Sequence, residues 1–196
     1  MALTVIIASF GDDRWIDLAD ERALPSVAHW PDVFHFHWPE TGRSVGAVRN
    51  LAVEASRADG WICFLDPDDE LAPGYLEAMT SAAVYPEDLY APALKLGSGP
   101  ARVLDDRDIV DGLNPCPIGT VIHRDTFDRV GGFWDERAWE DWSLFRRVAL
   151  TGGSIHFVPD AVYKAYPSTK GRNSTVTRPK ALRAEILDSH QRWMQT

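Results

Sequence analysis

The sequence predicts a single α/β domain in which helices flank a mostly parallel central sheet. Apolar runs of strand length alternate with segments of helical periodicity, the order typical of parallel sheets covered by helices. The length of 196 residues fits one compact unit. With 45% hydrophobic and 25% charged residues, the composition is that of a globular domain and excludes disordered and fibrous chains.

The N-terminal third begins this alternation. Residues 3–9 are rich in β-branched side chains and end in a turn cluster, which predicts a buried strand. Residues 33–38 alternate aromatic residues with His35 and His37, which predicts a second strand with one aromatic face. Over residues 44–57 apolar side chains recur at helical spacing, so we expect a helix there.

The middle of the chain continues the pattern with shorter pieces. Residues 61–65 form an apolar run before an acidic stretch, as in a central strand. Pro73 suits the first turn of a helix that Pro86 ends. Prolines and glycines interrupt residues 89–112, where we expect short strands and loops.

The second half is expected to contain further strands and helices. The strands are predicted at 118–123, 154–158 and 161–166, and the helices at 124–130, 140–151 and 179–194. Glycine pairs follow the first two helices and are interpreted as C-terminal caps rather than phosphate-binding loops. In a sheet of this class, ligands bind beyond the carboxyl ends of the strands.

The net charge limits the binding partners that the sequence allows, and the cysteine content indicates the cellular compartment. The net charge of −9 has the wrong sign for binding nucleic acid or an anionic membrane through electrostatics. Cys63 and Cys116 are expected to be reduced thiols, which together with the lack of a signal-like N-terminus predicts a cytoplasmic protein. No apolar stretch approaches the ~20 residues needed to span a bilayer.

An acidic pair follows the predicted central strand. Asp66 and Asp68 lie at its carboxyl end, and carboxylates are the ligands that Mg²⁺ and Mn²⁺ prefer. A divalent cation there could hold a diphosphate despite the acidic charge of the chain. The alternative is an ordinary turn in which Asp69 helps to cap the following helix.

A second acidic pair opens a predicted helix. Glu140 and Asp141 are candidates for a general base, although acidic residues also favour a helix N-terminus for electrostatic reasons alone. Trp139 and Trp142 beside them could wall a pocket, stack on a sugar ring or belong to the core.

Taken in order, these pieces resemble the family two glycosyltransferases, which are nucleotide-sugar enzymes of GT-A fold. Four stretches carry the resemblance: residues 4–10, 47–52, 61–69 and 120–146. The resemblance implies an inverting glycosyltransferase that moves a sugar from a nucleoside-diphosphate sugar to an acceptor hydroxyl. It further implies a nucleotide-sugar-binding half over 1–95 and an acceptor-binding and catalytic half with a C-terminal helix over 96–196.

The resemblance also assigns roles to single residues. Asp141 would be the general base, with Glu140 beside it in the catalytic pair. Asp68 would hold Mn²⁺ or Mg²⁺ on the diphosphate, and Asp66 would take part in both metal and donor binding. Further candidates for the donor site are Ala8, Ser9, Phe10 and Arg49.

The sequence departs from the family pattern in two places. The acidic turn that contacts the nucleotide base is replaced, and only Glu40 could substitute for it. The histidine that often completes the metal site has no counterpart near residue 166. Lys170 and Arg172, in a polar and basic stretch, are candidates to close over the diphosphate and compensate for the missing histidine. The alternative is a solvated loop whose positive charge balances the acidic remainder of the chain.

Two other functional classes fit parts of the sequence. A glycosyltransferase-like module could bind a sugar or a partner without turnover, since fold does not guarantee function. A haloacid-dehalogenase-like phosphatase also places an Asp-x-Asp after a strand, but that motif lies nearer the N-terminus. The sequence identifies neither the sugar nor the acceptor, which could be a glycan, lipid, protein or nucleic acid, and it indicates no oligomeric state.

Overall fold

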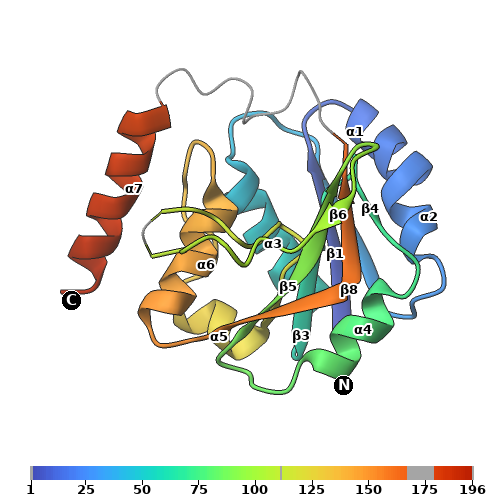
Figure 1. The fold of residues 1–196 in the computed structure, drawn as a ribbon. Helices are drawn as coiled ribbons and strands as arrows, with labels where there is room; N and C mark the ends of the chain where they lie inside the picture. Colours follow the sequence, from blue (N-terminus) through green and yellow to red (C-terminus); the bar gives the residue numbers. More distant parts are fainter. Residues whose placement is uncertain (1, 111, 167–178, 196) are drawn as a thin grey trace.

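The computed structural model describes residues 2–110, 112–166 and 179–195 as an α/β fold built on one eight-stranded sheet (Figure 1). The strands are β1 (Leu3–Phe10), β2 (Val33–Trp38), β3 (Trp61–Leu65), β4 (Glu70–Leu71), β5 (Leu89–Leu96), β6 (Ala101–Arg102), β7 (Val121–His123) and β8 (Ile155–Ala165). The helices are α1 (Arg14–Leu18), the π-helix η1 (Ala19–Ala23), α2 (Leu24–Val27), α3 (Val45–Ser56), α4 (Tyr75–Ala82), α5 (Arg124–Arg129), α6 (Glu140–Leu150) and α7 (Pro179–Trp193). The predicted class is confirmed, and most predicted elements lie within a few residues of their expected bounds.

The sheet is mixed and not wholly parallel. Its order is β2-β1-β3-β7-β5-β8-β4, with β6 on the side of β5. β1 runs parallel to β2 and β3, and β5 runs parallel to β8, whereas β7 is antiparallel to both β3 and β5. The described residues between β6 and β7 form no crossover helix, the connection that a parallel neighbour would need, and β7 enters the sheet in the opposite direction.

One predicted break in the sheet does not occur. The two strands expected at 154–158 and 161–166 are a single strand, β8. Its pairing with β5 shifts register between Val158 and Val162, and Pro159 lies in this bulge. A proline at a bulge removes no ladder hydrogen bond, so the strand continues past it.

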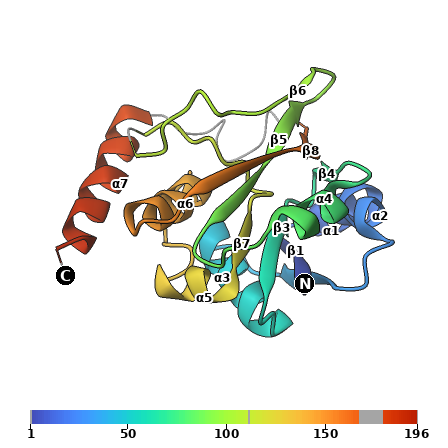
Figure 2. The same cartoon turned by 60° about the horizontal axis from the view of Figure 1, so that its bottom comes forward.

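The helices cover both faces of the sheet. α3, α5 and α6 lie on one side, and α1, α2 and α4 lie on the other (Figures 1 and 2). α7 packs against the outside of α6 and away from the sheet. The carboxyl ends of β1, β2 and β3 therefore meet at one edge, which is where ligands bind in sheets of this type.

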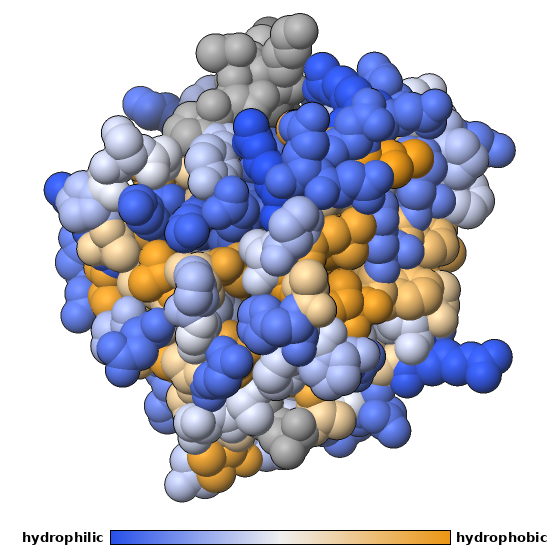
Figure 3. Space-filling model, turned by 90° about the vertical axis from the view of Figure 1, so that its right-hand side faces the viewer, coloured by the Kyte–Doolittle hydropathy of each residue, from blue (hydrophilic) through white to orange (hydrophobic). Residues whose placement is uncertain are grey.

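The state of the two cysteines and the distribution of apolar residues on one face can be read from the structure. Cys63 and Cys116 are buried and unpaired, as expected for reduced thiols. The side of the molecule on the right of Figure 1 shows apolar patches across its middle, with hydrophilic residues around them (Figure 3). Within the described ranges, no helix is long and apolar enough to cross a membrane.

Candidate active site

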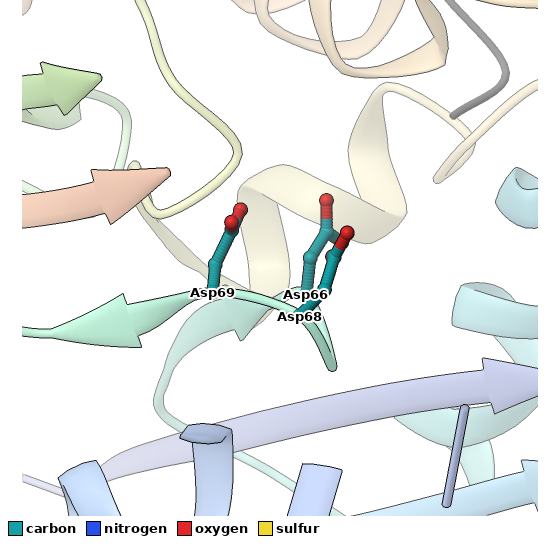
Figure 4. Close-up of side chains that lie close together, drawn as sticks. All are labelled: Asp66, Asp68 and Asp69. Atoms are coloured by element: carbon teal, nitrogen blue, oxygen red, sulfur yellow. The ribbon is translucent and has the colours of Figure 1, made fainter. Parts of the chain in front are cut away.

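The loop after β3 carries three carboxylates that converge. β3 is fully buried, and a turn closed by the hydrogen bond from the Asp69 amide to the Asp66 carbonyl (3.1 Å) follows it. One carboxylate oxygen from each of Asp66, Asp68 and Asp69 lies within 4.8 Å of the other two, and the three side chains leave the loop in the same direction (Figure 4). Three hard oxygen ligands fit Mg²⁺ or Mn²⁺.

Strand β8 fixes the third of these carboxylates. The Tyr163 hydroxyl donates to Asp69 Oδ2 at 2.8 Å, and the Tyr166 amide donates to Asp69 Oδ1 at 2.8 Å. Asp69 is therefore not a helix cap, and α4 begins without any side-chain cap. Burial and then the neighbouring Asp66 raise the pKa of both Asp69 and Asp68, a repulsion that a bound cation would relieve.

Arg49 of α3 joins this acidic loop to the start of α6. Its Nη2 lies 2.5 Å from Asp66 Oδ1, and its Nη1 lies 2.6 Å from Glu140 Oε1. Arg49 is only 5% exposed. Burial opposes the charge of its guanidinium, but Asp66 and Glu140 more than offset this effect and raise the pKa of Arg49. The structure thus brings together two regions that lie far apart in the sequence.

Asp141 follows Glu140 in the first turn of α6, where both of its oxygens accept hydrogen bonds. The Trp142 amide donates to Oδ1 at 2.8 Å, and Asn114 Nδ2 donates to Oδ2 at 3.2 Å. Burial and then the charge of Glu140 raise the pKa of Asp141 to about 7. A carboxyl group with this pKa can accept a proton near neutral pH, as a general base must.

The two tryptophans beside the acidic pair have different environments. Trp142 is buried, and its Nε1 donates to the Ile109 carbonyl at 3.4 Å, which places it in the core. Trp139 is partly buried and has a φ of 62°, in the left-handed region that residues with side chains rarely adopt. Such strained backbone is often found at functional sites.

The other predicted donor-site residues lie at the neighbouring strand ends. Ala8, Ser9 and Phe10 end β1, and Ser9 is buried with its hydroxyl 3.2 Å from His35 Nε2 and 3.0 Å from His37 Nδ1. Glu40 is exposed in the loop after β2. Lys170 and Arg172 lie outside the described residues.

Sequence reasoning missed three residues of this site. Tyr163 is an unremarkable strand residue in the sequence, and Asp69 looked like part of a turn. Asn114 stands in an Asn-Pro pair, a turn signal that does not indicate contact with Asp141. Its amide is oriented by the Cys116 amide, which donates to Asn114 Oδ1 at 3.0 Å and so leaves Nδ2 facing Asp141.

This fold and this arrangement of acidic residues define the class of the protein. Residues 5–110 match the family model described as glycosyl transferase family 2, and the chain belongs to that family. Its fold is that of the GT-A glycosyltransferases.

Several solved structures are similar to this chain. They include S. aureus TarS (TM-score 0.60, 16% identity, 95% of this chain and 42% of that one) and S. aureus TarS 1–349 in complex with UDP (0.60, 15%, 93% and 65%). GalNAc-T7 with UDP, GalNAc and Mn²⁺ is also similar (0.55, 12%, 86% and 45%). The chain therefore spans between 42% and 65% of these proteins, and at such identities the likeness concerns the fold. A comparison with curated proteins found no match.

Proposed function

We propose that this protein is an inverting, metal-assisted glycosyltransferase that uses a nucleoside-diphosphate sugar. The observation that carries the proposal is the arrangement of two acidic groups around Arg49. The carboxylates of the loop after β3 suit a cation and its diphosphate, and Asp141 on the far side of Arg49 suits an acceptor hydroxyl. The neighbours solved with UDP, one of them also with Mn²⁺, support a donor and a cation of this kind.

In this mechanism Asp141 accepts the proton of the acceptor hydroxyl through a carboxylate oxygen. The hydroxyl oxygen then forms a bond to the anomeric carbon, and the bond from that carbon to the diphosphate oxygen breaks on the opposite face. The bonding electrons leave with the diphosphate, and the configuration at the anomeric carbon is inverted. Glu140 keeps the start of α6 in place through Arg49.

Asp68, Asp66 and Asp69 would hold the divalent cation in this mechanism. When bound, such a cation would supply positive charge next to the leaving diphosphate and so stabilise the transition state. Ser9 and the adjoining residues at the end of β1 border the nucleotide in this proposal, and Glu40 is the candidate for contact with the base.

The proposal is tested by measuring nucleoside diphosphate release from a panel of nucleotide sugars in the presence of Mn²⁺ or Mg²⁺. We expect release that stops on chelation, and a product whose anomeric configuration by NMR is opposite to that of the donor. Asp68→Asn should weaken metal-dependent nucleotide binding in calorimetry. Asp141→Asn should retain that binding and lose turnover.

The matched control is Asp125→Asn on α5, whose side chain is 85% exposed and lies outside the site. Metal-dependent nucleotide binding without any turnover would favour a non-catalytic binding module. Cleavage of simple phosphoesters without sugar transfer would favour a phosphatase. Full nucleotide binding in chelator would remove the cation from the proposal.

A further inference from the structure

Arg49 contacts both the acidic loop after β3 and the first turn of α6. Its two terminal nitrogens are engaged by different carboxylates, Asp66 at 2.5 Å and Glu140 at 2.6 Å. Its guanidinium also stacks over the Phe133 ring, 5.3 Å from the ring centroid. These contacts leave the group 5% exposed, so little of it can reach a ligand.

We propose that Arg49 is a positioning residue that holds the general base and the acidic loop at a fixed separation, and not a ligand of the nucleotide. This inference rests on the proposed function. In this role Arg49 positions both Glu140, next to the proposed base Asp141, and Asp66, one of the proposed metal ligands. The planar guanidinium suits this role because it bonds two groups in fixed directions, which the single ammonium of lysine does not do.

The geometry of α3 explains why Arg49 can reach both partners. The Ser44 hydroxyl caps the helix by accepting a hydrogen bond from the Ala47 amide at 3.1 Å. One turn before Arg49, Gly46 lies so close to the segment before α6 that an added Cβ would be 2.8 Å from the Trp134 carbonyl oxygen. The missing side chain thus lets α3 approach the start of α6.

Arg49 also affects the pKa of Asp141 through its charge. The charged groups around Asp141 are Glu140 beside it on α6, Arg49 on α3 and Asp66 in the loop after β3, while the buried Cys116 thiol next to it stays neutral. Glu140 and Asp66 disfavour ionisation of Asp141, and Arg49 favours it. Removing the guanidinium should therefore make the base harder to ionise.

The test compares Arg49→Gln and Arg49→Lys with the wild-type protein. For Arg49→Gln we expect kcat to fall on the order of 100-fold through misplacement of the base. The donor KM should change by less than about threefold, and the pH midpoint of turnover should rise by about one unit. Arg49→Lys keeps the positive charge, so it should return the midpoint toward the wild-type value while kcat stays low.

The matched control is Arg124→Gln, because Arg124 is also held by two carboxylates, Glu54 at 2.8 Å and Asp128 at 2.8 Å, but starts α5 outside the site. We expect its kcat and pH midpoint to be unchanged. A donor KM that rises in proportion to the lost turnover, with an unmoved midpoint, would show that Arg49 binds the nucleotide and would overturn the proposal. If Arg49→Gln does not fold, kcat and the donor KM of Arg49→Lys provide the test. A low kcat with an unchanged donor KM supports a positioning role, and a raised donor KM contradicts it.

A measurement without substrate separates this inference from the proposed function. The carboxyl carbon of Asp141 can be titrated by NMR in wild-type and variant proteins labelled with ¹³C-aspartate, with Asp141→Asn providing the assignment. A pKa that rises in Arg49→Gln and returns in Arg49→Lys supports the role of Arg49 even if no donor is turned over. An unchanged pKa in Arg49→Gln contradicts it.

Discussion

Asp141 combines two hydrogen-bonded carboxylate oxygens with a raised pKa. Both oxygens are held by donors, the Trp142 amide and Asn114, yet burial and Glu140 raise its pKa to about 7. Hydrogen bonds to a carboxylate normally lower its pKa, so burial and the neighbouring charge outweigh them here. The protonation state of this residue therefore changes in the physiological range.

The first prediction concerns the pH dependence of turnover. Because a general base acts only when ionised, the proposed role of Asp141 requires kcat/KM to rise as the pH increases through about 7 and then to level off. Asp141→Asn should lower the plateau by a factor on the order of 10² to 10⁴ and remove the rise. Rates measured between pH 5 and 9 at fixed ionic strength check this, and a flat wild-type profile would contradict it.

The second prediction concerns stability at the same residue. The folded-state pKa of Asp141 is raised from 3.8 to about 7, so its favourable contribution is present at low pH and is lost as the pH rises through about 7. Asp141→Asn stays neutral and should melt above wild type at pH 8, by about 2–4 °C for each kcal/mol recovered. Calorimetry at pH 4 and pH 8 measures the difference, which should vanish at the lower pH.

At the scale of elements, α3 is joined to the start of α6 by the Arg49–Glu140 ion pair and lies close to the segment that leads into α6. A Cβ on Gly46 would lie 2.9 Å from the Phe133 Cβ and 2.8 Å from the Trp134 carbonyl oxygen in the segment before α6, and 3.6 Å from the Glu140 Cβ at the start of α6. None of these atoms is the far end of a flexible side chain. A side chain at this position must move α3 away from the segment that leads into α6, or displace that segment.

The third prediction follows from this close approach. Gly46→Ala should cost about 1–3 kcal/mol in the free energy of unfolding, as expected for overpacking. It should also lower kcat, because the displaced start of α6 carries both Glu140 and Asp141. Urea unfolding and steady-state kinetics measure the two effects. A variant with wild-type stability and wild-type kcat would show that the helices can separate without consequence.

The sequence predicts the positions of helices and strands better than it predicts which strands pair and which side chains meet. The strand at 33–38 is confirmed without change because period-two alternation and the flanking turns are local signals. The pairing of β7 with β3 joins segments about 60 residues apart and has no local signal, so the mixed sheet could not be anticipated. The site shows the same division: the acidic pairs are local patterns, whereas the bond from Tyr163 to Asp69 depends on how distant strands meet.

At the scale of the whole molecule, α7 is attached through a buried polar contact with α6. His190 of α7 is fully buried, with Nε2 3.0 Å from the Ser143 hydroxyl and Nδ1 2.8 Å from Arg146 Nη1. Burial, and then the charges of Arg147 and Arg146, lower the pKa of His190 to about 3. The imidazole therefore stays neutral in the folded protein across the physiological range.

The fourth prediction is acid sensitivity of this attachment. The folded-state pKa of His190 lies below its ordinary value of 6.5, so its contribution to stability is present above pH 6.5 and is lost as the pH falls toward 3. His190→Gln cannot gain a proton, and the stability advantage of wild type over this variant should shrink between pH 7 and pH 4. Chemical unfolding at several pH values measures it, and a constant difference would contradict the assignment.

The position of β8 in the chain also affects the order in which the molecule is completed during synthesis. The acidic loop is made early, but Asp69 is bonded to residues 94 and 97 positions later, Tyr163 and Tyr166. A growing chain holds these like charges without their permanent partners until its last strand has emerged. The arrangement of the three carboxylates is therefore completed late in folding, and under the proposed function a nascent or truncated chain should lack the metal affinity of the finished molecule.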